Sequence, residues 1–138
     1  MQQRVTIITL GVSDLQIATQ FYTETLDWET TEGSNEFITF FRLNGVLFSL
    51  YPIEKLAEDA KLEAKPLDFR GFTLAHNLHS EKEVDEFFEK LSTKGVRIVK
   101  QPEKVNWGGY SGYFSDPDGN LWEVAFNPFL PLDENGNI

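Results

Sequence analysis

The chain of 138 residues is 41% hydrophobic and 14% aromatic, which is enough apolar material for one compact domain with its own core. Its formal net charge of −10 disfavours nucleic acid and anionic lipid as partners and favours a cationic ligand, although the same acidity also serves solubility. The absence of cysteine excludes disulfides, zinc-thiolate sites and a cysteine nucleophile. No apolar run approaches the roughly 20 residues of a membrane span, and residues 1–4 lack a secretory layout, so we expect a cytoplasmic protein without membrane contacts.

The first half of the chain alternates between strand and helix periodicity. Ser13-Asp14 is a helix-start signal, and Asn44-Gly45 is a two-residue turn typical of a β-hairpin. Around these signals the apolar spacing follows strands or helices in turn. It predicts a strand over Val5–Val12, a helix over 15–26, a hairpin of Phe37–Arg42 and Val46–Tyr51, and a short surface helix over Glu54–Ala64 before the linker Lys65-Pro66.

The second half of the chain repeats this layout. Ser80 and Glu83 form a capping box at the start of a helix, and Gly95 is a helix C-cap. The turn Asp116-Pro-Asp-Gly119 joins the last two predicted strands. The predicted elements are a strand over Phe72–Leu78, a helix after Ser80, and strands over Val96–Val99, Tyr110–Ser115 and Leu121–Phe126.

The two halves are related by an internal repeat of 66 residues. Val12 matches Leu78 at the end of the opening strand, and Asp14 matches Ser80 at the helix start. A repeat of this length implies two similar supersecondary units. We therefore predict an α+β fold of two tandem βαβββ modules in one domain, with module one at about residues 1–65, module two at about 66–127 and a C-terminal tail over 128–138.

Three features together resemble one protein family. The modules occur in βαβββ order, the opening strand ends in Val-Ser-Asp-Leu before a helix with Phe21-Tyr22, and the closing hairpin reads Asp-Pro-Asp-Gly-Asn-Leu-Trp-Glu over 116–123. This combination is similar to the vicinal oxygen chelate superfamily, which includes glyoxalase I, bleomycin-resistance proteins and extradiol dioxygenases. The resemblance covers nearly the whole chain and implies that the mixed sheets curl into a half-open cup whose inward residues form the site.

The resemblance also implies where metal ligands would lie. In metal-dependent members, inward His, Gln or Glu residues bind a divalent ion and leave positions open for substrate oxygens. The matching positions in this sequence are Ile7, Ser49, Thr73 and Glu123, and only Glu123 is a strong ligand. We therefore predict no metal cofactor, with a divalent metal in a rearranged site as the alternative.

The two histidines are the remaining candidate ligands. Strand alternation from Thr73 puts Thr73, Ala75 and Asn77 on the cup side and His76 on the side that packs against the helix. A register slip of one residue would exchange the two sets. We interpret His76 as a packed residue and His79 as a loop residue near the helix start.

Without a metal, the predicted cup is an apolar and aromatic cavity with a few polar groups, as small-molecule sites usually are. The Gly-Gly loop before Tyr110 also carries Trp107, and these two aromatic residues either close over a ligand or pack within the loop. Trp122 and Phe126 alternate with Glu123 and are assigned to the core. The predicted ligand-binding residues are Ile7, Thr9, Ser49, Tyr51, Thr73, Asn77, Trp107, Tyr110 and Glu123.

Glu123 has three interpretations. It is a vestigial ligand held by neighbouring hydroxyls, a general base for proton abstraction beside a carbonyl, or the partner of a cationic group on a ligand. We favour a structural or binding role, and Glu123 is the candidate catalytic residue if the protein is an enzyme.

Two functions follow from these alternatives. The first is a metal-independent protein, resembling bleomycin-resistance proteins, that binds a small aromatic or cationic compound in the cup. The second is a lyase, isomerase or dioxygenase that uses a rearranged metal site or Glu123 as acid or base. The resemblance also implies a homodimer, because many members of the family complete their cups by pairing.

Overall fold

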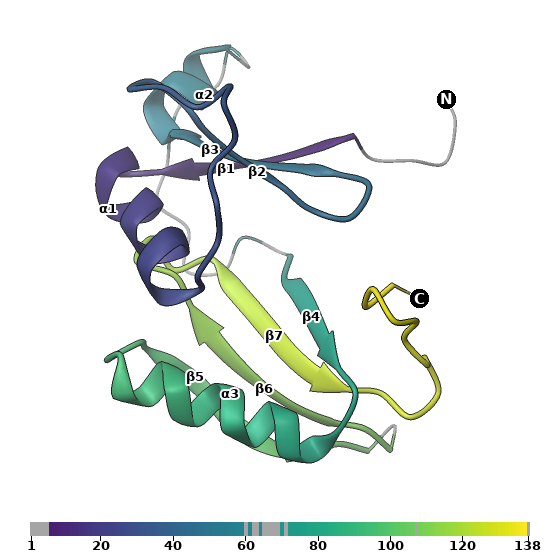
Figure 1. Cartoon of the computed structure of the whole chain (residues 1–138). Coiled ribbons are helices and arrows are strands. Elements are labelled where there is room, and N and C mark those ends of the chain that lie inside the picture. The colour runs from purple at the N-terminus through teal and green to yellow at the C-terminus, as the bar shows by residue number, and fades with distance from the viewer. Residues whose placement is uncertain are drawn as a thin grey trace. The chain divides into compact units, whose positions relative to one another are not determined.

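The computed structural model describes residues 6–59, 61, 64, 70, 72–106 and 108–137. Contacts divide the chain into two compact units, Met1–Asp68 and Phe69–Ile138, each of which combines strands with helices (Figure 1). The predicted linker Lys65-Pro66 lies outside the described residues. Among the helices that are described, none is long and apolar enough to cross a membrane.

The first unit is built on a three-stranded mixed sheet in the order β1-β3-β2. Strand β1 runs parallel to β3, and β2 runs antiparallel to it. The predicted hairpin turn is confirmed, because the Leu43 N–H donates to the Val46 carbonyl at 3.0 Å and Gly45 has a φ of 77°. The elements are β1 (Ile7–Val12), α1 (Leu15–Gln20), the π-helix η1 (Phe21–Thr25), β2 (Thr39–Arg42), β3 (Leu47–Pro52) and α2 (Ile53–Asp59).

An aromatic cluster forms the core of the first unit. The Tyr22 ring lies 5.3 Å from Trp28, 5.6 Å from Phe41 and 5.3 Å from Phe48, measured between ring centroids. Tyr22, Phe41 and Phe48 are buried. Because strand side chains alternate between faces, this packing assigns Phe41 and Phe48 to the core side of the sheet and their strand neighbours to the opposite face.

The predicted first helix is helical over most of its range, but its second half differs in geometry. Asp14 caps α1 by accepting a hydrogen bond from the Ile17 N–H at 2.9 Å. From Phe21 the turns widen into η1, where the Leu26 N–H reaches back five residues to the Phe21 carbonyl at 3.4 Å. The Thr23 hydroxyl donates to the Thr19 carbonyl at 2.9 Å, and such side-chain bonds compete with the regular backbone ladder.

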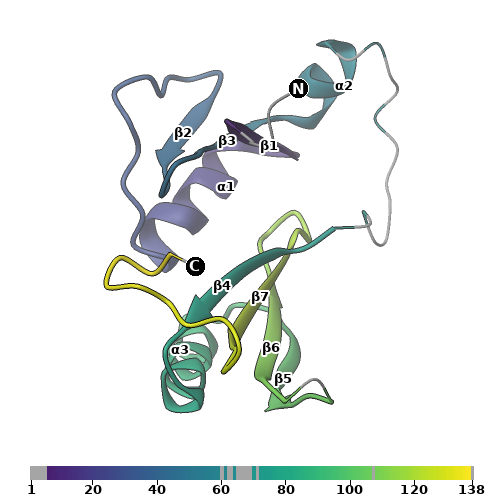
Figure 2. The same cartoon turned by 90° about the vertical axis from the view of Figure 1, so that its right-hand side faces the viewer.

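The second unit is a four-stranded mixed sheet in the order β4-β7-β6-β5. Helix α3 contacts all four strands and lies on one side of the sheet (Figure 2). The predicted cap is confirmed, since the Ser80 hydroxyl accepts from the Glu83 N–H at 3.2 Å, and Gly95 follows the helix with a φ of 72°. The elements are β4 (Leu74–Leu78), α3 (Glu81–Thr93), β5 (Ile98–Lys104), β6 (Tyr110–Ser115) and β7 (Leu121–Phe126).

Strands β6 and β7 lie where the sequence predicts them, whereas β5 does not. The turn between β6 and β7 is held by the buried Asp116, whose carboxylate accepts from the N–H groups of Asp118 at 3.0 Å and Asn120 at 2.8 Å. Strand β5 begins two residues later than predicted and continues through Pro102. It is an edge strand with two register shifts, and such strands tolerate proline and charged residues that otherwise indicate a loop.

The α+β class and the βαβββ modules are confirmed. Strands β1 and β4 end at Val12 and Leu78, and Asp14 and Ser80 cap the helices that follow, as the 66-residue repeat predicts. In the first unit, the strand expected directly after the helix is reduced to an isolated bridge between Thr30 and Phe41. Neither sheet closes on itself, because β1 and β2 are the edges of the first sheet and β4 and β5 are the edges of the second.

Candidate functional site

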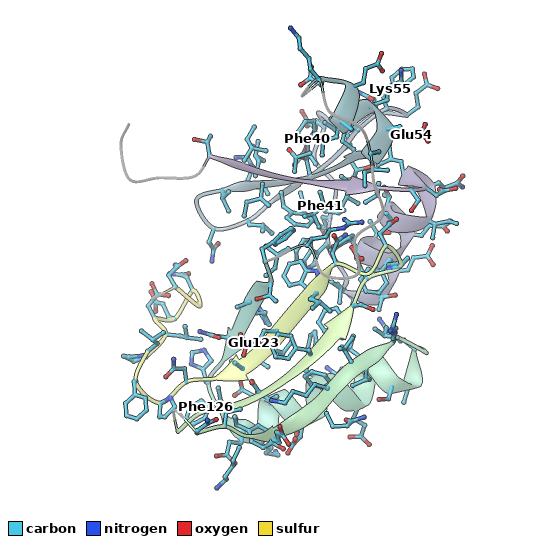
Figure 3. The ribbon with its side chains drawn as sticks, turned by 180° about the vertical axis from the view of Figure 1, so that it is seen from behind. Phe40, Phe41, Glu54, Lys55, Glu123 and Phe126 are labelled. Atoms are coloured by element: carbon cyan, nitrogen blue, oxygen red, sulfur yellow. The ribbon has the colours of Figure 1, made fainter. Side chains whose placement is uncertain are left out.

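Glu123 and Tyr113 form a polar pair on the second sheet. The register of β6 and β7 places Tyr113 directly opposite Glu123 of β7. Glu123 is labelled in Figure 3. Their strand neighbours Phe114 and Trp122 stack at 6.2 Å, and Phe114 lies 6.1 Å from Phe87 of α3. Because side chains alternate along a strand, Tyr113 and Glu123 point to the face away from α3.

The carboxylate of Glu123 affects the pKa of Tyr113. Burial raises the pKa of the Tyr113 hydroxyl, and the negative charge of Glu123 and the hydrogen bond to its carboxylate raise this pKa further. Tyr113 is therefore neutral near neutral pH and lies next to the Glu123 carboxylate. A carboxylate has two oxygens that accept hydrogen bonds from several directions, so the half-buried Glu123 keeps acceptor capacity for a cation or a donor on a ligand.

Tyr113 is a site residue that the sequence analysis missed. The signal for it lies in the hairpin turn Asp116–Gly119, because counting outward from this turn pairs residue 113 with residue 123. Directly opposite residues of an antiparallel pair share a face of the sheet. A hairpin predicted with its register therefore indicates the partner of Glu123.

On the first sheet, the predicted polar residues Thr9 and Ser49 lie together. They are register partners on β1 and β3, and their hydroxyl oxygens are 2.8 Å apart. Ser49 is fully buried, whereas Ile7 on the same face is 47% exposed. Tyr51 continues this face, opposite Gly11. The first unit thus presents a hydroxyl pair with an exposed alkyl group next to it.

Two of the other predicted residues lie on or beside the face of Glu123. The register puts Ala75 opposite Glu123 and Asn77 opposite Ala125, so Asn77 faces the same side as Glu123. Thr73 is exposed and directly precedes β4. Trp107 lies outside the described residues.

Tyr110 lies on the other face of this sheet. It shares the α3 side with Gly112 and Phe114, and its hydroxyl donates to Asp85 Oδ1 of α3 at 2.7 Å. This hydrogen bond, together with partial burial and the negative charge of Asp85, raises the pKa of Tyr110 to about 12. Tyr110 is therefore hydrogen-bonded to the helix and does not lie next to Glu123.

Both histidines lie where the sequence analysis places them along the chain, with His76 on the helix side and His79 before α3, but His76 is exposed and not packed as predicted. The His76 ring lies 6.0 Å from the Phe87 ring of α3, which places it on the helix side, and desolvation lowers the pKa of His76 although solvent still reaches the residue. His79 lies just before α3, where its backbone N–H donates to Glu83 Oε2 at 3.0 Å. Neither imidazole shares a face with Glu123.

The donor set at the family's metal positions does not fit a transition metal. Ile7 offers no donor atom, Ser49 is hydrogen-bonded to Thr9, and hydroxyls such as those of Ser49 and Thr73 are poor ligands for such ions. Within the described part of the chain, no three or more His, Asp or Glu residues are grouped so that they could hold a metal ion. Glu123 is the one strong donor at these four positions.

Two open mixed sheets, each combined with helices, define an α+β fold of two similar units. The model of the Glyoxalase/Bleomycin resistance protein/Dioxygenase superfamily matches residues 4–124, and the chain belongs to this superfamily. Its members bind small-molecule substrates, often use a divalent metal, and usually form dimers.

Relatives and solved structures agree with this assignment. Fosfomycin resistance protein FosX of Listeria monocytogenes is 30% identical over 123 residues, which are 85% of this chain and 84% of that protein. FosX of Listeria innocua is 29% identical over 124 residues, with the same shares covered. The crystal structure of a glyoxalase-related enzyme from Fulvimarina pelagi is similar with a TM-score of 0.86 and 34% identity, covering 99% of this chain and 96% of that one.

Proposed function

We propose that this protein binds a small aromatic or cationic compound without a metal, and that Glu123 with Tyr113 forms the recognition element. The observation that carries the proposal is the pairing of Tyr113 with Glu123, which lie directly opposite each other on the face away from α3, where the charge of Glu123 raises the pKa of Tyr113. A carboxylate in this setting receives an ammonium, guanidinium or N–H group of a ligand. The net charge of −10 attracts such a ligand from a distance.

The metal positions support this proposal. Three of the four positions carry Ile7, Ser49 and Thr73, which are poor metal ligands. The charge that interacts with a ligand at these positions is therefore the carboxylate of Glu123 and not a metal ion. On the first unit, the paired hydroxyls of Thr9 and Ser49 are hydrogen-bonding groups of the kind found in small-molecule sites. By analogy with the superfamily, we propose that the protein acts as a homodimer, which light scattering of the purified protein tests.

Calorimetric titration with metal-free bleomycin, a cationic compound with a flat aromatic part, tests the proposal. We expect saturable binding that is unchanged by EDTA. Glu123→Gln should weaken it by about tenfold, the scale of one charged hydrogen bond, and Tyr113→Phe by less. The control is Glu89→Gln, which removes an equal charge from the exposed surface of α3.

Two results would contradict the proposal. One is stoichiometric, tightly bound nickel, zinc, iron or manganese in protein purified without chelators. The other is an equal loss of binding in Glu123→Gln and Glu89→Gln, which would reduce the effect to the overall charge of the protein.

A second candidate function is supported by the two FosX relatives. In this case the protein is an enzyme that acts on fosfomycin, with Glu123 as acid or base or as one ligand in a rearranged metal site. Phosphorus NMR of fosfomycin incubated with the protein, with and without added manganese, zinc or nickel, separates the two functions. Conversion that Glu123→Gln abolishes favours the enzyme, and unchanged fosfomycin under every metal condition favours binding alone.

A further inference from the structure

A second candidate site lies within the first unit, in a pocket of about 560 Å³. Its volume falls in the range of about 300–1,000 Å³ that is usual for small-molecule sites. The pocket lies on the sheet face of the first unit that also carries Ser49, because Phe40 is the register partner of Ser49, whereas Tyr113 and Glu123 belong to the second unit. The pocket is lined by Thr30, Thr31, Glu32, Gly33, Phe40, Arg42 and Leu47.

Strand alternation in β2 explains one wall of this pocket. Phe41 packs into the aromatic core against Tyr22, so Phe40 and Arg42 on either side of it face away from the core. Phe40 is labelled on β2 in Figure 3. Leu47 of β3 is the register partner of Arg42, so an apolar side chain lies next to the guanidinium.

A second wall lies alongside β2 and is held in place by hydrogen bonds to the backbone of Phe40. The Thr31 N–H donates to the Phe40 carbonyl at 2.9 Å, and the Phe40 N–H donates to the Ser34 hydroxyl at 2.9 Å. The Ser34 hydroxyl in turn donates to the Phe40 carbonyl at 3.2 Å. The segment from Thr30 to Ser34 is therefore anchored along β2, and this anchoring holds the wall that it contributes to the pocket.

Two opposite charges line this pocket. Arg42 and Glu32 are both exposed, and neither takes part in an ion pair with another described residue. A guanidinium binds a carboxylate or phosphonate through parallel N–H groups. The carboxylate of Glu32 accepts from an ammonium group, while Phe40 and Leu47 provide apolar contacts.

We propose that this pocket binds a small zwitterion with an apolar side group, the chemistry of an amino acid. Its carboxylate pairs with Arg42, its ammonium with Glu32, and its side group packs on Phe40 and Leu47. A zwitterion has no net charge, so the overall charge of −10 does not repel it as it would a simple anion. The proposal does not depend on the function proposed for Glu123.

Calorimetric titration of the full chain with three related probes tests this assignment. L-Phenylalanine carries both charges, 3-phenylpropionate lacks the ammonium group, and phenethylamine lacks the carboxylate. We expect saturable binding of phenylalanine and about tenfold weaker binding of each of the other two. Arg42→Gln should weaken the binding of phenylalanine about tenfold and leave the binding of phenethylamine unchanged. Glu32→Gln should also weaken the binding of phenylalanine about tenfold and leave the binding of 3-phenylpropionate unchanged.

Matched controls separate the pocket from general electrostatics. Arg97→Gln and Glu36→Gln remove the same charges at exposed positions that do not line the pocket, and they should leave phenylalanine binding intact. Absence of saturable phenylalanine binding, equal affinity for all three probes, or an equal loss in the control variants would each overturn the proposal. Because the bleomycin test depends on Glu123 and Tyr113, and the phenylalanine test on Arg42 and Glu32, one proposal can fail while the other holds.

Discussion

Gly112 lies where β6 passes closest to α3, and its replacement by alanine should destabilise the second unit. A methyl group on Gly112 would come within 2.6 Å of Phe88 Cζ, and within 2.9 Å of the Lys100 carbonyl oxygen and of the Pro102 nitrogen. Carbon atoms in contact are normally about 3.5–4.0 Å apart, so the overlap with the Phe88 ring is about 1 Å. Phe88 is only 3% exposed, and the other two atoms belong to the backbone of β5, so none of the three can move away freely.

Overpacking of a core usually costs about 1–3 kcal/mol, and we expect Gly112→Ala near the upper end, about 3 kcal/mol, because two of the three clashing atoms are backbone. That is a large share of the about 5–15 kcal/mol by which a domain is stable. Urea unfolding followed by circular dichroism measures the loss.

The control for this experiment is Gly33→Ala. Its methyl group would meet Thr31 Oγ1 at 3.7 Å and Phe40 Cδ2 at 3.8 Å, which are ordinary contacts, so the change in unfolding free energy should stay within about 0.5 kcal/mol. If Gly112→Ala were as stable as Gly33→Ala, the close packing of α3 and β5 around Gly112 would be refuted.

Three further predictions concern two tyrosines and the cap of α3. Glu123→Gln should lower the pKa of Tyr113 and leave that of Tyr110 unchanged, whereas Asp85→Asn should lower the pKa of Tyr110 and leave that of Tyr113 unchanged. NMR titration of carbon-13-labelled tyrosine measures both pKa values. A fall of both in one variant would contradict the assigned pairs. The pKa of Tyr110 is raised from 10.0 to about 12. The stability that the hydrogen bond between Tyr110 and Asp85 contributes is therefore fully present below a pH of about 10 and is lost as the pH rises through about 12. In Asp85→Asn, the urea midpoint should fall less over this pH range than in the wild type. Ser80→Ala removes the hydroxyl that caps α3 and should cost about 1 kcal/mol, and an unchanged urea midpoint would show that this cap contributes nothing.

Local signals in the sequence were sufficient for most of the fold. Turn and cap residues such as Asp14, Gly45, Ser80 and Gly95 act through bonds to their near neighbours in the chain, so their effect is readable without a structure. The 66-residue repeat added long-range information, because two copies of one pattern imply two copies of one module. Strand β5 was misplaced at both ends because an edge strand is defined by its neighbour, and its own residues carry little strand signal.

The candidate site was only half predictable. Glu123 was found through the resemblance, and the loss of ligand residues at Ile7 and Thr73 is visible in the sequence alone. Tyr113 became a site residue only through pairing across β6 and β7, and Tyr110 was assigned to the helix side by its bond to Asp85 of α3.

The pocket beside Arg42 also depended on tertiary structure. Its walls come from β2, β3 and the segment around Gly33, which hydrogen bonds bring together. The sequence by itself determined most of the strands and helices and the residue type at each position of the candidate site, because these properties depend on residue type and on local spacing. Which side chains meet on one face was decided by strand register and helix packing, because contacts between residues far apart in the chain form only when the sheet assembles.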